Sequence, residues 1–447
     1  MNVFFVSLGC DKNLVDSEEM LGLLVERGIR ITDHEENADI IVVNTCGFIH
    51  DAMEESVQTL LEMAEYRAGG SCKALIVTGC LAQRFKEDIL EEIPEIDAVI
   101  GTGGFDRLGQ VLDRVLAGEK VLHITPPEGL PHLRSRRVVT TGGHYEYLKI
   151  AEGCDKHCTY CVIPYLRGSY RSVPMEQLVE QARRLADGGV SELILVAQET
   201  TLYGVELYGE KALHRLLREL CAIPGLSWIR ILYCYPEEIY PELIDVMKTE
   251  KKICHYLDLP IQHASDRILK LMGRRTTREK LEALIAKLRE AMPDIALRTT
   301  LITGFPGETQ EDHEELLDFI DEMEFDRLGV FTYSREDGTP AAGMDGQIDE
   351  EVKEARKAEI MELQQEISLD KGQARIGQII EAVVEGKVAD EDAYVGRTYA
   401  DTPGVDGYVF IHTSYNLMSG DFVRVCVTGA LEYDLIGEIY EEDEYAE

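Results

Sequence analysis

Three cysteines with the spacing CxxxCxxC, namely Cys154, Cys158 and Cys161, are the residues of this chain best suited to chemistry. Thiolates at this spacing can bind three irons of a cubane iron–sulfur cluster and leave the fourth iron without a protein ligand. Four-cysteine ferredoxin runs and paired CxxC zinc knuckles close the coordination sphere, whereas this spacing leaves it open. The alternative is three buried or zinc-binding cysteines. A strand-like run at residues 145–150 predicts that the loop leaves the C-terminal end of a strand.

A second set of cysteines lies in the first quarter of the chain. Cys10, Cys46 and Cys80 each follow a run that is typical of a strand, at residues 3–8, 39–44 and 73–78. In open parallel sheets, ligand sites gather outside the carboxyl ends of the strands. The three thiols could therefore converge on a second cluster with one open iron. Three buried packing residues are the alternative, and Cys72, which precedes its strand, does not fit the set.

The elements that position these cysteines alternate between strands and helices. Residues 1–124 have the pattern of a doubly wound α/β domain with a parallel sheet. Asp16, with Glu19 three residues later, looks like the N-cap of the first helix. The further helices are predicted at residues 51–66, 85–92 and 105–116. Residues 125–144 read as a linker with a small basic patch, which is either solvated charge or a contact for an anion: Arg134, Arg136 and Arg137.

Residues 145–371 repeat the alternation and predict a full or partial β/α (TIM-like) barrel. Its further strands are predicted at residues 192–197, 228–233, 254–259, 295–303 and 327–333, with helices between them such as 175–186 and 277–292. In such a barrel the loops at the strand C-termini form the reactive face. The cysteine loop would share this face with Gln198, Glu199, Gln262, His263 and the glycine-rich turn at 304–308. That turn lacks the lysine of a nucleotide P-loop. It either lets a ligand approach the backbone closely or is an ordinary turn.

After a long charged helix at residues 349–371 the pattern changes to short strands. Five are predicted at residues 379–384, 394–399, 407–411, 421–428 and 434–439, and they suggest a small antiparallel β-barrel within residues 374–441. Residues 374–447 hold sixteen acidic and four basic residues. A barrel that grips RNA would carry a basic stripe, and this one does not.

Composition limits the class of protein. The chain of 447 residues is long enough for two or three domains. Its formal net charge of -38 either disfavours nucleic acid as a partner and favours a basic protein, or is simply typical of an acidic cytosolic proteome. Eleven cysteines in a chain with a cluster motif suit a reducing cytoplasm better than a disulfide framework. The apolar N-terminus lacks a basic leader and predicts a strand rather than a signal peptide. No run of about 20 apolar residues predicts a membrane span.

With all three parts placed, the chain resembles the methylthiotransferase family of radical S-adenosylmethionine (SAM) enzymes along nearly its whole length. Members of this family join an N-terminal domain with an auxiliary cluster to a radical SAM barrel and a C-terminal TRAM domain. The resemblance implies two 4Fe–4S clusters, with Cys10, Cys46 and Cys80 as ligands of the auxiliary one and Cys154, Cys158 and Cys161 as ligands of the SAM-binding one. In the family, SAM supplies both the 5'-deoxyadenosyl radical and the methyl group.

Two branches of the family differ in substrate. The MiaB type modifies tRNA adenosines, and the RimO type methylthiolates the β-carbon of an aspartate in small-subunit ribosomal protein twelve. Three stretches look like the RimO type: SLGCDKNLVDSE at 7–18, VAQETTLYG at 196–204 and LDLPIQH at 257–263. Asp11 and Glu199 depart mildly from the family's proline and aspartate. The acidic C-terminal barrel would suit a very basic ribosomal protein.

The resemblance also implies roles for single residues and partners. No catalytic side chain is expected beyond the cluster-bound cofactors, because a radical opens the β-carbon C–H bond. Tyr160 is expected against the cluster or the adenine, or else in the core. Gln198, Glu199 and Asp258 are expected to contact SAM on their strand-end positions alone. The expected partners are the ribosomal protein and an electron donor such as flavodoxin or ferredoxin, without a membrane or a nucleic-acid substrate. A tRNA methylthiotransferase and a non-catalytic iron–sulfur protein that binds the ribosome remain as alternatives.

Overall fold

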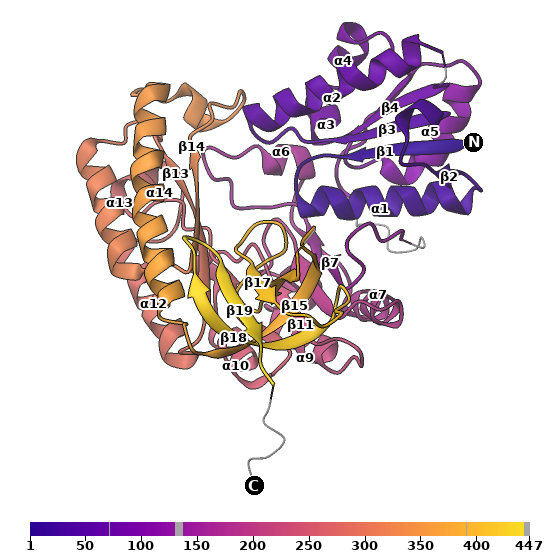
Figure 1. Ribbon diagram of the computed structural model, residues 1–447. Helices are drawn as coiled ribbons and strands as arrows, with labels where there is room; N and C mark the ends of the chain where they lie inside the picture. Colours follow the sequence, from indigo (N-terminus) through magenta and orange to yellow (C-terminus); the bar gives the residue numbers. More distant parts are fainter. Residues whose placement is uncertain (71, 130–136, 390, 442–447) are drawn as a thin grey trace.

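Figure 1 shows the chain, a computed structural model, as two α/β parts followed by a small β-barrel. The structure describes residues 1–70, 72–129, 137–389 and 391–441. The first part is built on a six-stranded parallel sheet with the order β2-β1-β3-β4-β5-β6. Its strands are β1 (Asn2–Ser7), β2 (Arg30–Ile31), β3 (Ile40–Thr45), β4 (Ala74–Gly79), β5 (Ala98–Ile100) and β6 (Val121–His123). Its α-helices are α1 (Asp11–Glu26), α2 (His50–Ala68), α3 (Cys80–Phe85), α4 (Glu87–Glu92) and α5 (Leu108–Leu116).

The central strands of this sheet, β3 and β4, are buried along their whole length and rich in β-branched residues. Such strands must be covered on both faces of a sheet. Helices α1 and α5 pack on one face, and α2, α3 and α4 pack on the other. The predicted doubly wound parallel-sheet domain is therefore confirmed.

Two predictions for this part are wrong in detail. Asp16 does not cap the first helix, because α1 already begins at Asp11 with Cys10 as its N-cap residue. Asp16 lies inside α1, where its buried carboxylate contacts Lys149 and Arg167 of the second part. The helix expected at 85–92 corresponds to α4, which begins only at Glu87, because Lys86, with φ of 48°, separates it from a further short helix, α3, that was not predicted.

The second part is a six-stranded parallel sheet with the order β14-β13-β12-β11-β10-β7. The strands are β7 (Tyr145–Lys149), β10 (Glu192–Val196), β11 (Trp228–Ile231), β12 (Ile253–Asp258), β13 (Ala296–Thr303) and β14 (Arg327–Thr332). The order has two ends, so the described strands form the partial version of the predicted barrel. A two-stranded ribbon of β8 (Ala151–Glu152) and β9 (Arg171–Ser172) follows β7. The α-helices are α6 (Ile163–Arg167), α7 (Met175–Asp187), α8 (Val205–Tyr208), α9 (Leu213–Cys221), α10 (Pro241–Thr249), α11 (Asp266–Leu271), α12 (Arg278–Ala291), α13 (Gln310–Met323) and α14 (Glu350–Gln373).

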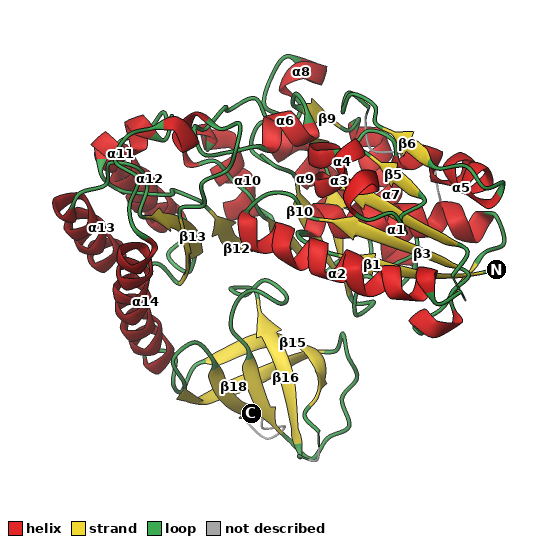
Figure 2. Cartoon of the chain, turned by 90° about the horizontal axis from the view of Figure 1, so that it is seen from above, coloured by secondary structure: helices red, strands yellow, loops and turns green. Residues whose placement is uncertain are grey.

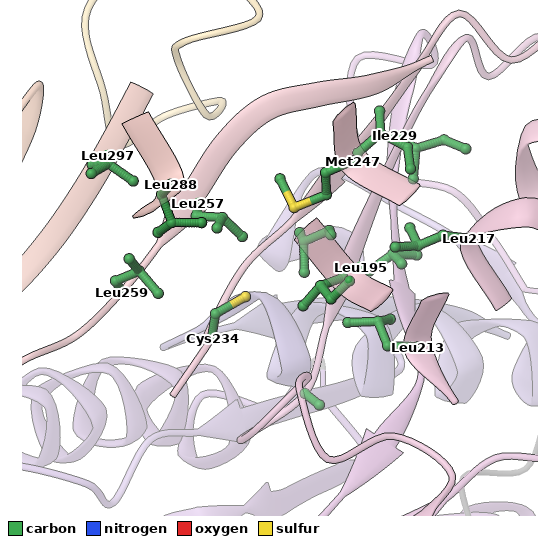
Figure 3. Close-up of a cluster of buried hydrophobic side chains, with 14 of the residues drawn as sticks. Leu195, Leu213, Leu217, Ile229, Cys234, Met247, Leu257, Leu259, Leu288 and Leu297 are labelled. Atoms are coloured by element: carbon green, nitrogen blue, oxygen red, sulfur yellow. The ribbon is translucent and has the colours of Figure 1, made fainter. Parts of the chain in front are cut away.

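The core of the second part lies between its sheet and its outer helices. Figure 3 shows leucines of β10, β12 and β13 with Ile229 of β11, close to Leu213 and Leu217 of α9, Met247 of α10 and Leu288 of α12. Cys234 belongs to the same cluster, so this thiol has a packing role. The opposite face of the sheet is covered by the start of α1 and by the C-terminal barrel.

The third part is a closed barrel with the order β15-β16-β17-β19-β18, and α14 leads into it (Figure 2). Its strands are β15 (Ile379–Lys387), β16 (Ala393–Thr398), β17 (Val409–His412), β18 (Phe422–Ala430) and β19 (Leu435–Ile439). The barrel was expected to be antiparallel, but β17 and β19 pair in parallel. Its other four pairings are antiparallel. Within the described residues, no helix is both long and apolar enough to cross a membrane.

The basic patch predicted for the linker is only partly within the described residues, since Arg134 and Arg136 lie outside them. Arg137 is not a solvated linker charge. Its guanidinium is buried between the carboxylates of Glu18 and Glu146 and donates a hydrogen bond of 2.6 Å to the backbone oxygen of Tyr147. The residue therefore joins α1 of the first part to β7 of the second.

Candidate active site

The CxxxCxxC loop lies between β8 and α6, and its backbone is held by segments on either side. Gly153 precedes the first cysteine with φ of 81°, and a Cβ there would lie 2.2 Å from the backbone oxygen of Ser169. Only glycine fits this conformation and this close approach. The N–H of Thr159 donates to the backbone oxygen of Met272 at 3.0 Å. The loop therefore has a fixed path between the β8–β9 ribbon and the end of α11.

The three thiols of this loop are held in a partly enclosed place. Burial raises the pKa of Cys154 to about 11 and raises that of Cys161 further, and the neighbouring thiols add to both shifts. The Cys158 sulfur lies 2.6 Å from the hydroxyl of Tyr235, whose ring is covered by the guanidinium of Arg274 at 3.8 Å. Thiols whose charged form is disfavoured by burial become good thiolates only when a cation or a metal compensates the charge.

The other three cysteines converge from three strand ends of the first sheet. Cys10 caps α1 after β1, Cys46 follows β3, and Cys80 begins α3 directly after β4. A Cβ on Gly9 would lie 2.9 Å from the Cβ of Cys46, and a Cβ on Gly47 would lie 2.8 Å from the backbone carbon of Cys80. The loops thus pack against one another, as the strand-end rule predicts. Burial raises the pKa of Cys46 to about 11, with Cys80 and Cys10 adding to the shift.

Arg167, six residues after Cys161 of the CxxxCxxC loop, links this loop to the other cysteine set. Its Nε donates to the Cys80 sulfur at 3.4 Å, and its terminal nitrogens donate to Asp16 at 2.7 Å and to the side-chain oxygen of Asn13. The guanidinium is fully buried at the junction of the two α/β parts. Burial raises the pKa of the Cys80 thiol, and the Arg167 charge acts in the opposite direction.

A chain of hydrogen bonds continues from this junction to the CxxxCxxC loop. Glu152 accepts from Lys149 at 2.8 Å and, on its other oxygen, from the amide nitrogen of Gln198 at 2.7 Å. The Gln198 oxygen accepts from the N–H of Gly153 at 2.8 Å. Gln198, expected as a SAM contact, thus binds the Glu152 side chain with one end of its amide and the backbone just before Cys154 with the other.

Glu199 and Tyr160 lie close to the same loop. Glu199 is fully buried, and one of its oxygens accepts from the N–H of Thr201 at 2.9 Å, whereas the other has no partner among the described residues. Burial raises the pKa of Glu199 to about 7. Tyr160 packs edge-on against Phe305 with ring centroids 6.5 Å apart, and burial together with the Cys158 thiol raises its pKa.

Asp258, the remaining expected SAM contact, ends β12 and supports a strained neighbour. It accepts from the N–H of Tyr233 at 3.0 Å and from Arg298 at 2.9 Å. Tyr233 has a φ of 58°, and His157 and Gln262 on the same set of loops have φ of 51° and 73°. Such conformations cost about 1–3 kcal/mol each for residues other than glycine, and they gather at functional sites.

His263 and the turn at 304–308 stabilise one corner of this face. The Nδ1 of the buried His263 accepts from the N–H groups of Ala264 and Ser265, both at 3.0 Å. Its Nε2 lies 3.7 Å from Glu308, which Arg356 also contacts at 2.7 Å. A Cβ on Gly304 would lie 2.2 Å from the Lys353 side chain. This glycine therefore makes room for α14, and the turn serves packing.

Family models match all three parts of the chain. The radical SAM superfamily matches residues 148–320, the uncharacterized protein family UPF0004 matches residues 2–101, and the TRAM domain matches residues 376–439. The chain is 63% identical to the ribosomal protein uS12 methylthiotransferase RimO of Lachnoclostridium phytofermentans, over 98% of this chain and 99% of that protein. The RimO protein of Pelotomaculum thermopropionicum is 52% identical, again over 98% and 99%. The chain belongs to the RimO family of radical SAM methylthiotransferases.

Solved structures with much lower identity share the fold. The radical SAM methyltransferase TsrM of Kitasatospora setae, with cobalamin and a [4Fe-4S] cluster bound, superposes with a TM-score of 0.56 at 15% identity over 76% of each chain. The cobalamin-dependent SAM radical enzyme OxsB gives a TM-score of 0.52 at 16% identity over 81% of this chain and 56% of that chain. These likenesses concern the arrangement of the parallel-sheet parts.

Radical SAM enzymes of the RimO family use SAM and a 4Fe–4S cluster, and the donor set of this chain fits such a group. All six cysteines of the two sets are free thiols. Thiolates are the ligands that iron–sulfur clusters take, and each set supplies three. Within the described residues, no three His, Cys, Asp or Glu side chains are arranged to hold a single metal ion.

Four residues of the site were missed from the sequence: Arg167, Tyr233, Arg274 and Lys12, whose Nζ lies 3.1 Å from the centroid of the Tyr233 ring. Arg167 and Lys12 lie within a few residues of a cluster cysteine, which was the one signal available. Tyr233 and Arg274 acquire their places only through the tertiary structure, since nothing in the local pattern marks a positive φ or a cation over an aromatic ring.

Proposed function

We propose that the protein is a methylthiotransferase that replaces a C–H bond on the β-carbon of an aspartate of ribosomal protein uS12 with a C–S bond to a methylthio group. The observation that carries the proposal is the packing of Cys80 against Val162, which directly follows Cys161, together with the hydrogen bond from Arg167 to the Cys80 sulfur. The names of the relatives, which are similar over nearly their whole length, support the same substrate.

The chemistry explains why two sets are needed. A β-carbon C–H bond has too little acidity for side-chain acid–base catalysis to open it. When bound, SAM and a cluster on Cys154, Cys158 and Cys161 supply a carbon radical that removes the hydrogen, and a second 4Fe–4S cluster on the other set supplies a site for the sulfur. The protein's own contribution is placement and the exclusion of water.

Several buried side chains serve this placement. Gln198 fixes the backbone before the SAM-type loop, and Asp258 fixes Tyr233 opposite α1. Glu199 has one buried carboxylate oxygen free among the described residues. It therefore remains a proposed contact for a polar group of SAM. Tyr160 is proposed to pack beside the cofactor.

The acidic surface supports a basic protein substrate. The C-terminal barrel presents exposed acids on several of its strands and loops: Glu381, Glu391, Asp392, Glu432, Glu438 and Glu441. One of the barrel's few basic residues, Arg397, is buried against Glu192 and Glu385. Such a surface attracts a positively charged protein and repels RNA. We further propose a small electron-transfer protein, flavodoxin or ferredoxin, as the reductant, and a cytoplasmic location.

The test is anaerobic turnover of the reconstituted protein with SAM and dithionite, offered uS12 and unmodified tRNA together, with mass spectrometry of both. A methylthio adduct on an aspartate of uS12 is the expected result. An adduct on tRNA alone would refute the proposed substrate. If neither SAM cleavage nor an adduct is observed, the protein is a non-catalytic iron–sulfur protein.

A further inference from the structure

Lys12 is a buried cation without a carboxylate partner. It lies on the first turn of α1, two residues after Cys10, and is only 6% exposed. Its Nζ lies 3.1 Å from the centroid of the Tyr233 ring. No carboxylate lies within ion-pair distance of this ammonium group among the described residues. An ammonium group removed from water without a paired charge is costly, so such a group points to a missing anion.

The other buried cations of the described chain show how unusual this is. Besides Arg137, eight lysine and arginine residues are buried, and seven of these contact a carboxylate: Lys149, Arg167, Arg230, Arg274, Lys353, Arg356 and Arg397. Lys12 is the exception. The acids near it are already engaged, because Asp11 accepts from the Tyr233 hydroxyl at 2.9 Å and Asp258 is paired with Arg298.

Several contacts fix the tyrosine ring on which the ammonium group lies. Tyr233, on whose ring it lies, is held in a left-handed conformation with φ of 58°. Its N–H is fixed by Asp258 and its hydroxyl by Asp11. The ring face attracts the cation but does not neutralise its charge. The group therefore lies between α1, which begins at the Cys10 end of one cysteine set, and the strand-end loops of the sheet that carries the other.

We propose that Lys12 binds the side-chain carboxylate of the substrate aspartate and so positions its β-carbon for the reaction. The inference rests on the proposed function, because it takes the aspartate of uS12 as the substrate. The carboxylate is bonded directly to the β-carbon, so anchoring the carboxylate fixes the reacting carbon to within one bond. A desolvated charge pair is strong and directional, and placement of the reacting atom is the main service that the protein can supply here.

The test compares the wild-type protein with Lys12→Met, which keeps the length and removes the charge. Lys73→Met is the matched control, since Lys73 precedes β4, at the opposite end of this strand from Cys80, and pairs with Asp39 at 2.7 Å. We expect kcat/KM for uS12 to fall about 10- to 100-fold in Lys12→Met, the size expected for losing a hydrogen bond to a charged group. It should stay unchanged in Lys73→Met.

Substrate variants give a second, independent readout. The wild-type protein should bind a uS12 peptide with the modified aspartate at least tenfold more tightly than the Asp→Asn peptide, measured by fluorescence anisotropy. Lys12→Met should bind the two peptides equally. Iron and sulfide content, and SAM cleavage by dithionite without uS12, should remain at the wild-type level in Lys12→Met.

Three results would overturn the inference. Equal binding of both peptides by the wild-type protein would show that no cation binds the aspartate carboxylate. This test uses only the wild-type protein, so it does not depend on the folding of a variant. A loss of iron in Lys12→Met would make Lys12 a counter-charge for the cluster at Cys10. Full turnover by Lys12→Met would exclude a role in positioning. If the wild-type protein itself leaves uS12 unmodified, the proposed function fails first and the inference fails with it.

Discussion

The attachment of the C-terminal barrel depends on one buried carboxylate. Glu192 begins β10 and is fully buried, with one oxygen 2.8 Å from Arg230 Nε on β11 and the other 2.6 Å from a terminal nitrogen of Arg397 on β16. Burial acts to raise the pKa of Glu192, but the two guanidinium groups outweigh it and the pKa is lowered. The carboxylate is therefore charged at neutral pH and joins the second α/β part to the barrel.

Replacing Glu192 by Gln keeps the shape and removes the charge. Arg397 retains Glu385, whereas Arg230 loses its carboxylate and keeps only the backbone oxygens of residues 398 and 399. Removing one partner of a buried ion pair costs about 3–5 kcal/mol. With a urea m-value of about 3 kcal/mol/M, the unfolding midpoint should fall by about 1–1.7 M.

The chain carries its own reporter for this experiment. Trp228 is the single tryptophan, and its ring packs edge-on against Phe422 of β18 with centroids 4.9 Å apart. Its fluorescence in urea therefore follows separation of the barrel from the sheet. Glu180→Gln, which breaks the exposed pair with Arg184 on α7, is the matched control and should move the midpoint hardly at all. Equal midpoints for the two variants would refute the reasoning.

Further predictions concern the clusters, pH and salt. Cys158→Ala should abolish SAM cleavage, whereas Cys46→Ala should spare cleavage and stop methylthio insertion, both measured by mass spectrometry. Continued transfer by both variants would refute the two-cluster proposal. Burial raises the pKa of Glu19 to about 8, above its ordinary value of 4.5. The stability due to its neutral form is full below pH 4.5 and is lost as pH rises through 8. Glu19→Gln should therefore match the wild type in urea midpoint at pH 5 and exceed it at pH 9, and an equal difference at both values would contradict this. Association of uS12, followed by stopped flow, should slow about tenfold or more between low and high salt, and no salt dependence would remove the role of the acidic surface.

The fold could be predicted largely from the sequence because its signals are local. Buried strands such as β3 and β4 are continuous β-branched runs, and their predicted bounds were shifted by one residue. The two cysteine sets were predictable because one is a fixed spacing and the other repeats at three strand ends. Gln198, Glu199 and Asp258 were expected at strand ends, and the structure places them there, although contact with SAM stays a prediction.

Contacts between the parts of the chain could not be predicted in this way. Asp16 has the local pattern of a helix cap, yet its carboxylate is bound by Lys149 and Arg167, more than 130 positions away along the chain. Arg137 looked like a solvated linker charge and is buried between two glutamates. A local sequence pattern indicates only the contacts that a residue can make within its own segment. Asp16 and Arg137 instead contact residues of another part of the chain.

The buried ion pairs also bear on the acidic surface. The chain has 45 basic and 83 acidic residues, and besides Arg137 eight of the basic ones are buried among the described residues. Seven of these eight contact carboxylates, and three of the seven do so between two parts of the chain: Lys149, Arg167 and Arg397. The excess of acidic over basic residues therefore remains, and fewer cations are left at the surface to interrupt it. A surface with this excess of acidic residues suits a basic substrate. Among the buried lysine and arginine residues that the structure describes, Lys12 differs in having no carboxylate partner, which is why we assign it to the carboxylate of the substrate.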